Sequence, residues 1–123
     1  MAESPHKGKT GVERLINATR YSLSGFAAAA STEDAFRQEL LLALVMVPLG
    51  LWIGNSGADK ALLVASVLLV LVVELINSAV EATVDRISLE DHPLAKRAKD
   101  IGSAAVMLSL VNAAAVWLLV LAV

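Results

Sequence analysis

The sequence predicts an all-α membrane protein, in which an N-terminal amphipathic surface helix precedes three transmembrane helices. Hydrophobic residues make up 57% of the 123 residues, and the mean hydropathy is +0.69, which exceeds what a soluble core requires. Three long apolar segments concentrate this excess. Acidic side chains interrupt one of these segments, which indicates a function within or beside the lipid.

The composition limits the chemistry available to the chain. It contains no cysteine, which excludes thiol catalysis, disulfides and cysteine metal sites, and its histidines are His6 and His92. A metal site would therefore consist of oxygen ligands, which suit Mg²⁺, Mn²⁺ or Ca²⁺. The length indicates a single membrane domain over residues 1–123.

Residues 1–10 are polar and lack the apolar core of a signal peptide, so we predict a mobile tail. Residues 11–31 then show helical periodicity, with apolar side chains along one side and Arg14 and Tyr21 on the other. This pattern predicts an amphipathic helix lying on the membrane surface. Arg14 and Tyr21 suit either a solvated face or a ligand held beside the membrane.

The three apolar segments predict transmembrane helices over about residues 33–54, 60–85 and 100–123. Ser31 or Thr32 is expected to cap the first of these helices, and Pro48 could kink it. A turn around residues 54–60 separates the first helix from the second. Asp100 has the character of an N-cap for the third helix, although Lys99 and Asp100 would also suit a phosphate site.

The basic residues predict the orientation in the membrane. Nine of the ten lysines and arginines precede the uncharged apolar run that begins at Leu40 or lie between the second and third apolar segments, and Lys60 is the exception. Because cytoplasmic loops carry an excess of basic residues, we expect a cytoplasmic N-terminus and a C-terminus outside the cell.

The second apolar segment carries a polar stripe, which we define as Glu74, Asn77, Ser78, Glu81 and Asp85. At about 100° per residue these side chains share one side of a helix, and Glu81 lies about 10 Å along the axis from Glu74. Neutral hydrogen bonding between helices could explain the amides and hydroxyls. It does not explain the acids, because an ionised carboxylate within lipid costs about 2.5–3.5 kcal/mol.

The polar stripe is also part of a wider resemblance. The segments 74–81, 84–86 and 98–106, together with 35–39, are similar to the prokaryotic diacylglycerol kinase family. The resemblance implies a homotrimer of three-span subunits in the bacterial inner membrane. It also implies transfer of the γ-phosphoryl group of MgATP to diacylglycerol, with Mg²⁺ as the cofactor and no nucleic-acid partner.

The resemblance implies a role for each matching residue. Glu74 corresponds to the catalytic base, Glu33 and Glu81 to metal ligands, and Asn77 and Asp85 to supporting residues. The positions that match ATP contacts are Arg14, Tyr21, Glu33, Glu81, Glu90, Asp91, His92, Lys99 and Asp100. The positions that match lipid contacts are Arg14, Ala35, Phe36, Arg37, Gln38, Glu39, Trp52, Glu74 and Ser103.

Two other functions fit the sequence. An undecaprenol kinase would use the same base, metal and ATP site with a polyprenol acceptor. A small proton-linked transporter would use Glu74 as a proton relay. Against the transporter, the chain shows no inverted repeat, and the acids of the second apolar segment are confined to its cytoplasmic end.

Overall fold

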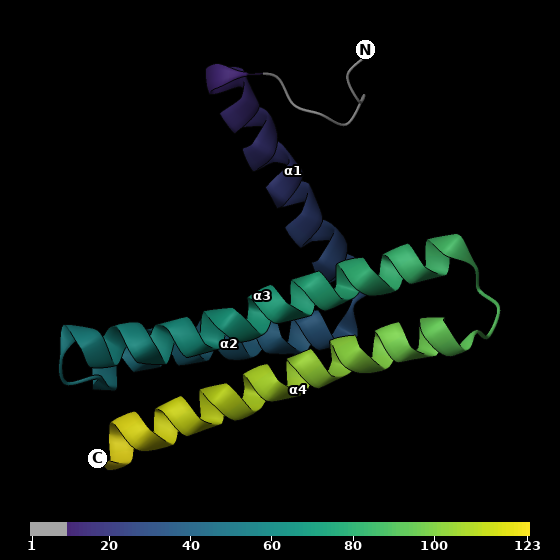
Figure 1. Cartoon of the computed structure of the whole chain (residues 1–123). Helices are drawn as coiled ribbons and strands as arrows, with labels where there is room; N and C mark the ends of the chain where they lie inside the picture. The colour runs from purple at the N-terminus through teal and green to yellow at the C-terminus, as the bar shows by residue number, and fades with distance from the viewer. Residues whose placement is uncertain (1–9) are drawn as a thin grey trace. The chain divides into compact units, whose positions relative to one another are not determined.

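The computed structural model describes residues 10–123, and this part of the chain forms four helices (Figure 1). They are α1 (Gly11–Thr32), α2 (Asp34–Ile53), α3 (Gly57–Ile87) and α4 (Pro93–Ala122). The mobile tail predicted at residues 1–10 lies, apart from Thr10, outside the described residues. The chain divides after Thr32, so α1 is one unit and residues 33–123 form a second.

Helices α2, α3 and α4 follow one another up and down as two antiparallel hairpins (Figure 1). Among the described residues these three helices are long and apolar enough to cross a membrane, which agrees with the three predicted spans. Helix α3 packs against both of the others. With 31 residues it is about 46 Å long, so it extends beyond a hydrocarbon core of about 30 Å.

The start of α2 differs from the prediction. Its N-cap is Glu33, whose side chain makes no capping hydrogen bond. The hydroxyls of Ser31 and Thr32 instead donate to the carbonyl of Ala28, at 3.1 and 2.7 Å, and both residues end α1. The predicted cap at Ser31 or Thr32 was therefore wrong, because these side chains bond back into the helix that precedes them.

The start of α4 also differs. The helix begins at Pro93, and His92 is its N-cap, with Nδ1 accepting a hydrogen bond of 3.0 Å from the backbone N–H of Leu94. Proline suits the first helical position because its fixed φ fits a helix and it lacks an N–H that would be unpaired there. Asp100 lies inside α4, so the predicted N-cap at Asp100 was wrong.

The interior of the α2–α4 unit is small and contains polar anchors. Phe36 and Leu63 are fully buried. The Trp117 indole N–H lies 3.2 Å from both the Leu63 carbonyl and the Ser66 hydroxyl, so it links α4 to α3. A Cβ at Gly50 would lie 3.1 Å from the Leu63 Cβ, which shows how closely α2 approaches α3 there.

Large apolar side chains cover the outside of the same unit. They include Leu44 on α2 and Leu108 on α4, which are 65% and 68% exposed. Apolar side chains on an outer surface are what lipid contact requires. The fold therefore buries polar side chains between helices and leaves apolar ones on the outside.

Candidate functional site

The polar stripe of α3 runs from buried to exposed positions. Glu74 and Asn77 are buried, with 5% and 8% of their surface exposed, while Ser78 and Glu81 are half-buried and Asp85 is exposed. Asn77 Nδ2 donates a hydrogen bond of 3.2 Å to Glu81 Oε1. The amide of Asn77 thus holds one oxygen of Glu81 in place.

A carboxylate of α2 joins this stripe. Glu39 faces Glu74 closely enough for the two carboxyl groups to interact, and Glu33 and Glu81 also lie within electrostatic range of Glu74. The atom Oε2 of Glu39 is buried and has no hydrogen-bond partner within residues 10–123. The structure therefore brings together four glutamates, which we call the carboxylate cluster: Glu33, Glu39, Glu74 and Glu81.

The carboxylate cluster has the donor chemistry of a magnesium site. Within residues 10–123, no three histidines, aspartates or glutamates come close enough together to hold a metal ion by themselves. Mg²⁺ usually binds one or two protein carboxylates and completes its coordination with phosphate oxygens and water. Glu81, with one oxygen held by Asn77, and Glu33 both lie within electrostatic range of Glu74, and each could supply one carboxylate of this kind.

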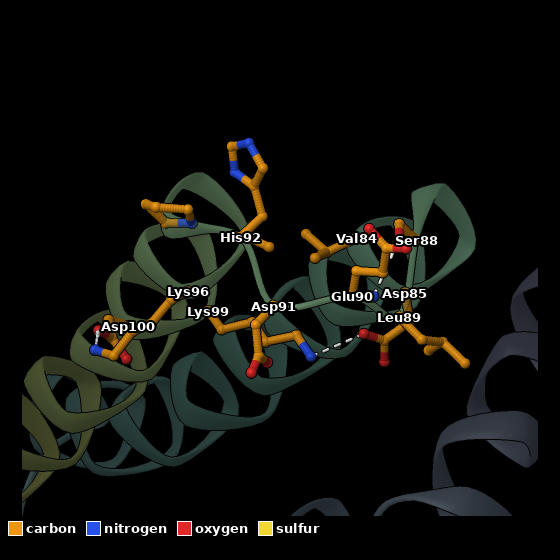
Figure 2. A pocket seen from close by; sticks show the side chains of 12 residues that line it. Val84, Asp85, Ser88, Leu89, Glu90, Asp91, His92, Lys96, Lys99 and Asp100 are labelled. Atoms are coloured by element: carbon orange, nitrogen blue, oxygen red, sulfur yellow. Dashed lines mark hydrogen bonds and ion pairs between the residues drawn. The ribbon is translucent and has the colours of Figure 1, made fainter.

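An open pocket of about 730 Å³ lies where the loop after α3 leads into α4 (Figure 2). Its lining includes Asp85 from α3, Glu90 and Asp91 from the loop, and Lys96 and Lys99 from α4. His92 and Asp100 also contribute to the lining. Most of the residues predicted from the resemblance to contact ATP therefore surround one pocket.

Both lysines of the pocket already have acidic partners. Lys99 Nζ lies 2.8 Å from Asp85 Oδ1, and Lys96 Nζ lies 2.6 Å from Asp100 Oδ2 (Figure 2). The first pair joins α3 to α4, and the second spans one turn of α4. A bound phosphate would replace an aspartate as the lysine's partner.

The residues predicted to contact lipid are dispersed. Ala35, Arg37, Gln38 and Ser103 are exposed, whereas Phe36 is fully buried between helices. The Arg37 guanidinium forms an ion pair with Asp34. Trp52 is 81% exposed near the other end of α2, where its indole cannot meet the carboxylate cluster. Helical geometry separates Trp52 from Glu39 by about 20 Å along the axis.

Arg14 and Tyr21 belong to α1, the separate unit. Both side chains are exposed there. The apolar residues of the predicted membrane-facing side are exposed as well, among them Val12 at 72% and Leu23 at 64%.

Sequence reasoning missed two contacts. The first is Gly102 of α4, which lies directly against the Asn77 amide. The second is the Trp117 indole, which bonds to Ser66 on α3. The small side chains at 102–105 are typical of close helix approach, but no local pattern identifies Asn77 or Ser66 as the partner, because each contact depends on the packing of α4 against α3.

Three helices of membrane-spanning length, a carboxylate cluster around the buried Glu74 and a charged pocket at one helix junction define a small helical membrane protein with an acidic site. The chain belongs to the prokaryotic diacylglycerol kinase family, whose model matches residues 20–121. It is 52% identical to the diacylglycerol kinase of Pseudomonas aeruginosa over 121 residues, which cover 98% of each chain.

Two further relatives show the same likeness. The diacylglycerol kinase of Haemophilus influenzae is 48% identical over 108 residues, which cover 88% of this chain and 92% of the relative. The diacylglycerol kinase of Escherichia coli K12 is 46% identical over 112 residues, which cover 91% of this chain and 92% of the relative. The family resemblance inferred from the sequence motifs is confirmed.

Proposed function

We propose that this protein is an ATP-dependent diacylglycerol kinase that makes phosphatidic acid in the bacterial inner membrane. The observation that carries the proposal is the buried carboxylate of Glu74, inside a chain that is 52% identical to a protein named diacylglycerol kinase. A buried acid on an apolar helix is costly, which makes a purely structural role a poor explanation for it.

Glu74 acts in this proposal as the general base. Its carboxylate accepts the proton of the lipid hydroxyl as the hydroxyl oxygen forms a bond to the γ-phosphorus of ATP. The bond between the γ-phosphorus and the bridging oxygen breaks, and ADP leaves with that oxygen. The burial of Glu74 keeps water from competing as the acceptor.

Glu33 and Glu81 hold the magnesium ion of MgATP in this proposal. When bound, Mg²⁺ would neutralise charge on the phosphate oxygens. The support from this chain is the Asn77 amide, which fixes one Glu81 oxygen. Asn77 therefore has a supporting role.

The charged pocket between α3 and α4 receives the nucleotide. Before the nucleotide binds, the ion pair with Asp85 limits where the Lys99 side chain can lie. When the nucleotide binds, Lys99 separates from Asp85 and places its positive charge beside a phosphate. Glu90, Asp91 and Asp100 line the pocket as candidate partners for the ribose and base. Since His92 Nδ1 is used in the cap of α4, its Nε2 is the atom left for a nucleotide contact.

The lipid approaches from the side of α2 in this proposal. Glu39 reaches Glu74 from α2, and the exposed residues Ala35, Arg37, Gln38 and Ser103 are the predicted lipid contacts that a headgroup can reach. Phe36 is assigned to packing, because none of its surface is exposed. Trp52 suits a contact with lipid at the opposite interface.

The assembly and topology are part of the same proposal. Helix α1 lies on the cytoplasmic surface of the membrane with Arg14 and Tyr21 facing water, and the C-terminus lies outside the cell. Subunits associate, because one three-helix subunit screens a carboxylate cluster from lipid poorly, and the number three is what the family resemblance implies. The support is the exposed apolar surface of α1, α2 and α4.

The test is transfer of labelled γ-phosphate from ATP in detergent micelles that contain either diacylglycerol or undecaprenol. We expect labelled phosphatidic acid that requires Mg²⁺ and is absent with the Glu74→Gln variant. If only undecaprenol is labelled, undecaprenol is the acceptor lipid in place of diacylglycerol, and the proposed site residues are unchanged. If a folded protein labels neither lipid, the kinase proposal fails, and a small proton-linked transporter becomes the favoured function.

A further inference from the structure

The Asn77 amide is held from two sides within the α3–α4 hairpin. Its Nδ2 donates to Glu81 Oε1 at 3.2 Å, so the oxygen Oδ1 must point the other way. That oxygen is buried and has no conventional hydrogen-bond partner in the described chain. A buried carbonyl oxygen without a partner usually costs free energy, so its surroundings call for an explanation.

The neighbour of this oxygen is the backbone of Gly102 on α4. A Cβ built on Gly102 would lie only 2.0 Å from Asn77 Oδ1 and 3.1 Å from Cγ. An ideal Cβ lies along the direction of one Cα–H bond of glycine, so this hydrogen is on the side of Gly102 that faces Oδ1. The Cα–Cβ bond length added to the 2.0 Å from Cβ to Oδ1 puts the Gly102 Cα no more than about 3.5 Å from the oxygen. The contact is close enough for a weak Cα–H···O hydrogen bond.

Glycine is required here for space. The φ angle of Gly102 is negative or extended, since Gly11 is the one glycine of residues 10–123 with a positive φ. Any larger residue would place an atom where the Asn77 oxygen now lies. The amide is the end of a flexible side chain, so it would rotate away and lose its bond to Glu81.

We propose that Gly102 is a positioning residue for the metal-binding carboxylate, acting through Asn77 on Glu81. This inference rests on the proposed function, because it takes Glu81 to be a magnesium ligand. Residues that orient metal ligands from outside the coordination sphere typically change metal affinity or activity 10–100-fold when they are mutated. The α4 backbone thereby sets the orientation of a side chain on α3.

The test measures binding of Mn²⁺, as a probe for Mg²⁺, by electron paramagnetic resonance in the presence of a non-hydrolysable ATP analogue. Gly102→Ala and Asn77→Ala should each weaken Mn²⁺ binding by about tenfold and raise the Mg²⁺ concentration needed for half-maximal activity by a similar factor. The double variant should be no worse than Asn77→Ala alone, because both changes remove the same contact.

Two other glycines provide matched controls. Gly57→Ala adds a Cβ that meets nothing within 4 Å, and Gly50→Ala disturbs helix packing against Leu63, away from the carboxylate cluster. Neither should alter Mn²⁺ affinity, although Gly50→Ala should lower thermal stability. A drop in Mn²⁺ affinity with Gly50→Ala as large as with Gly102→Ala would reduce the effect to general packing and overturn the inference.

Side-chain amide resonances give a readout that does not depend on metal. In a sample labelled with ¹⁵N-asparagine, the resonance missing from Asn77→Ala identifies Asn77, and Gly102→Ala should shift it. If Gly102→Ala leaves both this resonance and Mn²⁺ affinity unchanged, the inference is wrong. Should Gly102→Ala fail to fold, the double variant with Asn77→Ala must restore folding, and continued failure overturns the proposed contact.

The Glu81→Gln variant separates the positioning role of Gly102 from the metal-binding role of Glu81. If it weakens Mn²⁺ binding while Gly102→Ala does not, the positioning role alone fails. If Glu81→Gln has no effect on Mn²⁺ binding, the assignment of Glu81 fails and the positioning role fails with it, while lipid phosphorylation is judged by its own assay.

Discussion

Replacing Glu74 by glutamine separates its chemical role from its structural role. The substitution preserves the size and shape of the side chain and removes the group that accepts a proton. Glu74 lies near Glu39, Glu81 and Glu33, so the substitution also removes one of four neighbouring acids. Because like charges in a buried site repel, the variant should unfold at the same temperature as the wild type or a higher one.

The kinetic effect should be large. Loss of a general base lowers turnover by about 10²–10⁴-fold, which corresponds to about 2.7–5.4 kcal/mol at 1.36 kcal/mol per tenfold. The affinity for MgATP should stay within about twofold, because the proposed metal ligands and the α3–α4 pocket are unchanged. An effect on turnover without an effect on binding is the signature of a group needed only in the transition state.

The assay combines three measurements on one preparation: phosphate transfer to diacylglycerol in micelles, equilibrium binding of a nucleotide analogue, and thermal unfolding. Asp59→Asn is the matched control, because it removes an acid from the first turn of the same helix. That position is about 22 Å along the axis from Glu74, so turnover should not change. A parallel fall in nucleotide affinity and turnover for Glu74→Gln, or a loss of turnover below about tenfold, would refute the assignment of Glu74 as the base.

Three further predictions follow from the site and its packing. Glu33→Gln and Glu81→Gln should each raise the Mg²⁺ concentration required for activity, because each removes a charged oxygen ligand; rescue of neither by excess Mg²⁺, with unchanged ATP affinity, would contradict the ligand assignment. At an Mg²⁺ concentration where each variant alone is inactive, Glu74→Gln and Glu33→Gln chains that are unfolded and reassembled together should regain some activity, because one site uses residues of two subunits; cross-linked mixed oligomers that stay inactive would place each site in one chain. Trp117→Phe should lower stability by about 1–2 kcal/mol without changing the Mg²⁺ requirement, because it removes the indole donor shared by Leu63 and Ser66; a changed Mg²⁺ requirement would connect this anchor to the site.

Local patterns predicted much of the fold. The three long apolar helices, and the gradient from the buried Glu74 to the exposed Asp85, follow from hydropathy and from the 100° spacing of helical side chains. The helix starts were less predictable. Asp100 and Ser31 each had the character of an N-cap, yet His92 and Glu33 take those positions. Capping residues are common near helix ends, and the backbone that follows them decides which one is used.

The sequence by itself determined three features: the absence of cysteine ligands, a row of acids on an apolar helix, and the motifs of a lipid kinase family. Only the tertiary structure decided which groups meet across helices, namely Glu39 with Glu74, Asp85 with Lys99, and Gly102 with Asn77. The physical reason is that periodicity fixes the side of a helix on which a residue lies. The rotation and height at which two helices pack depend on the fit of all their side chains together.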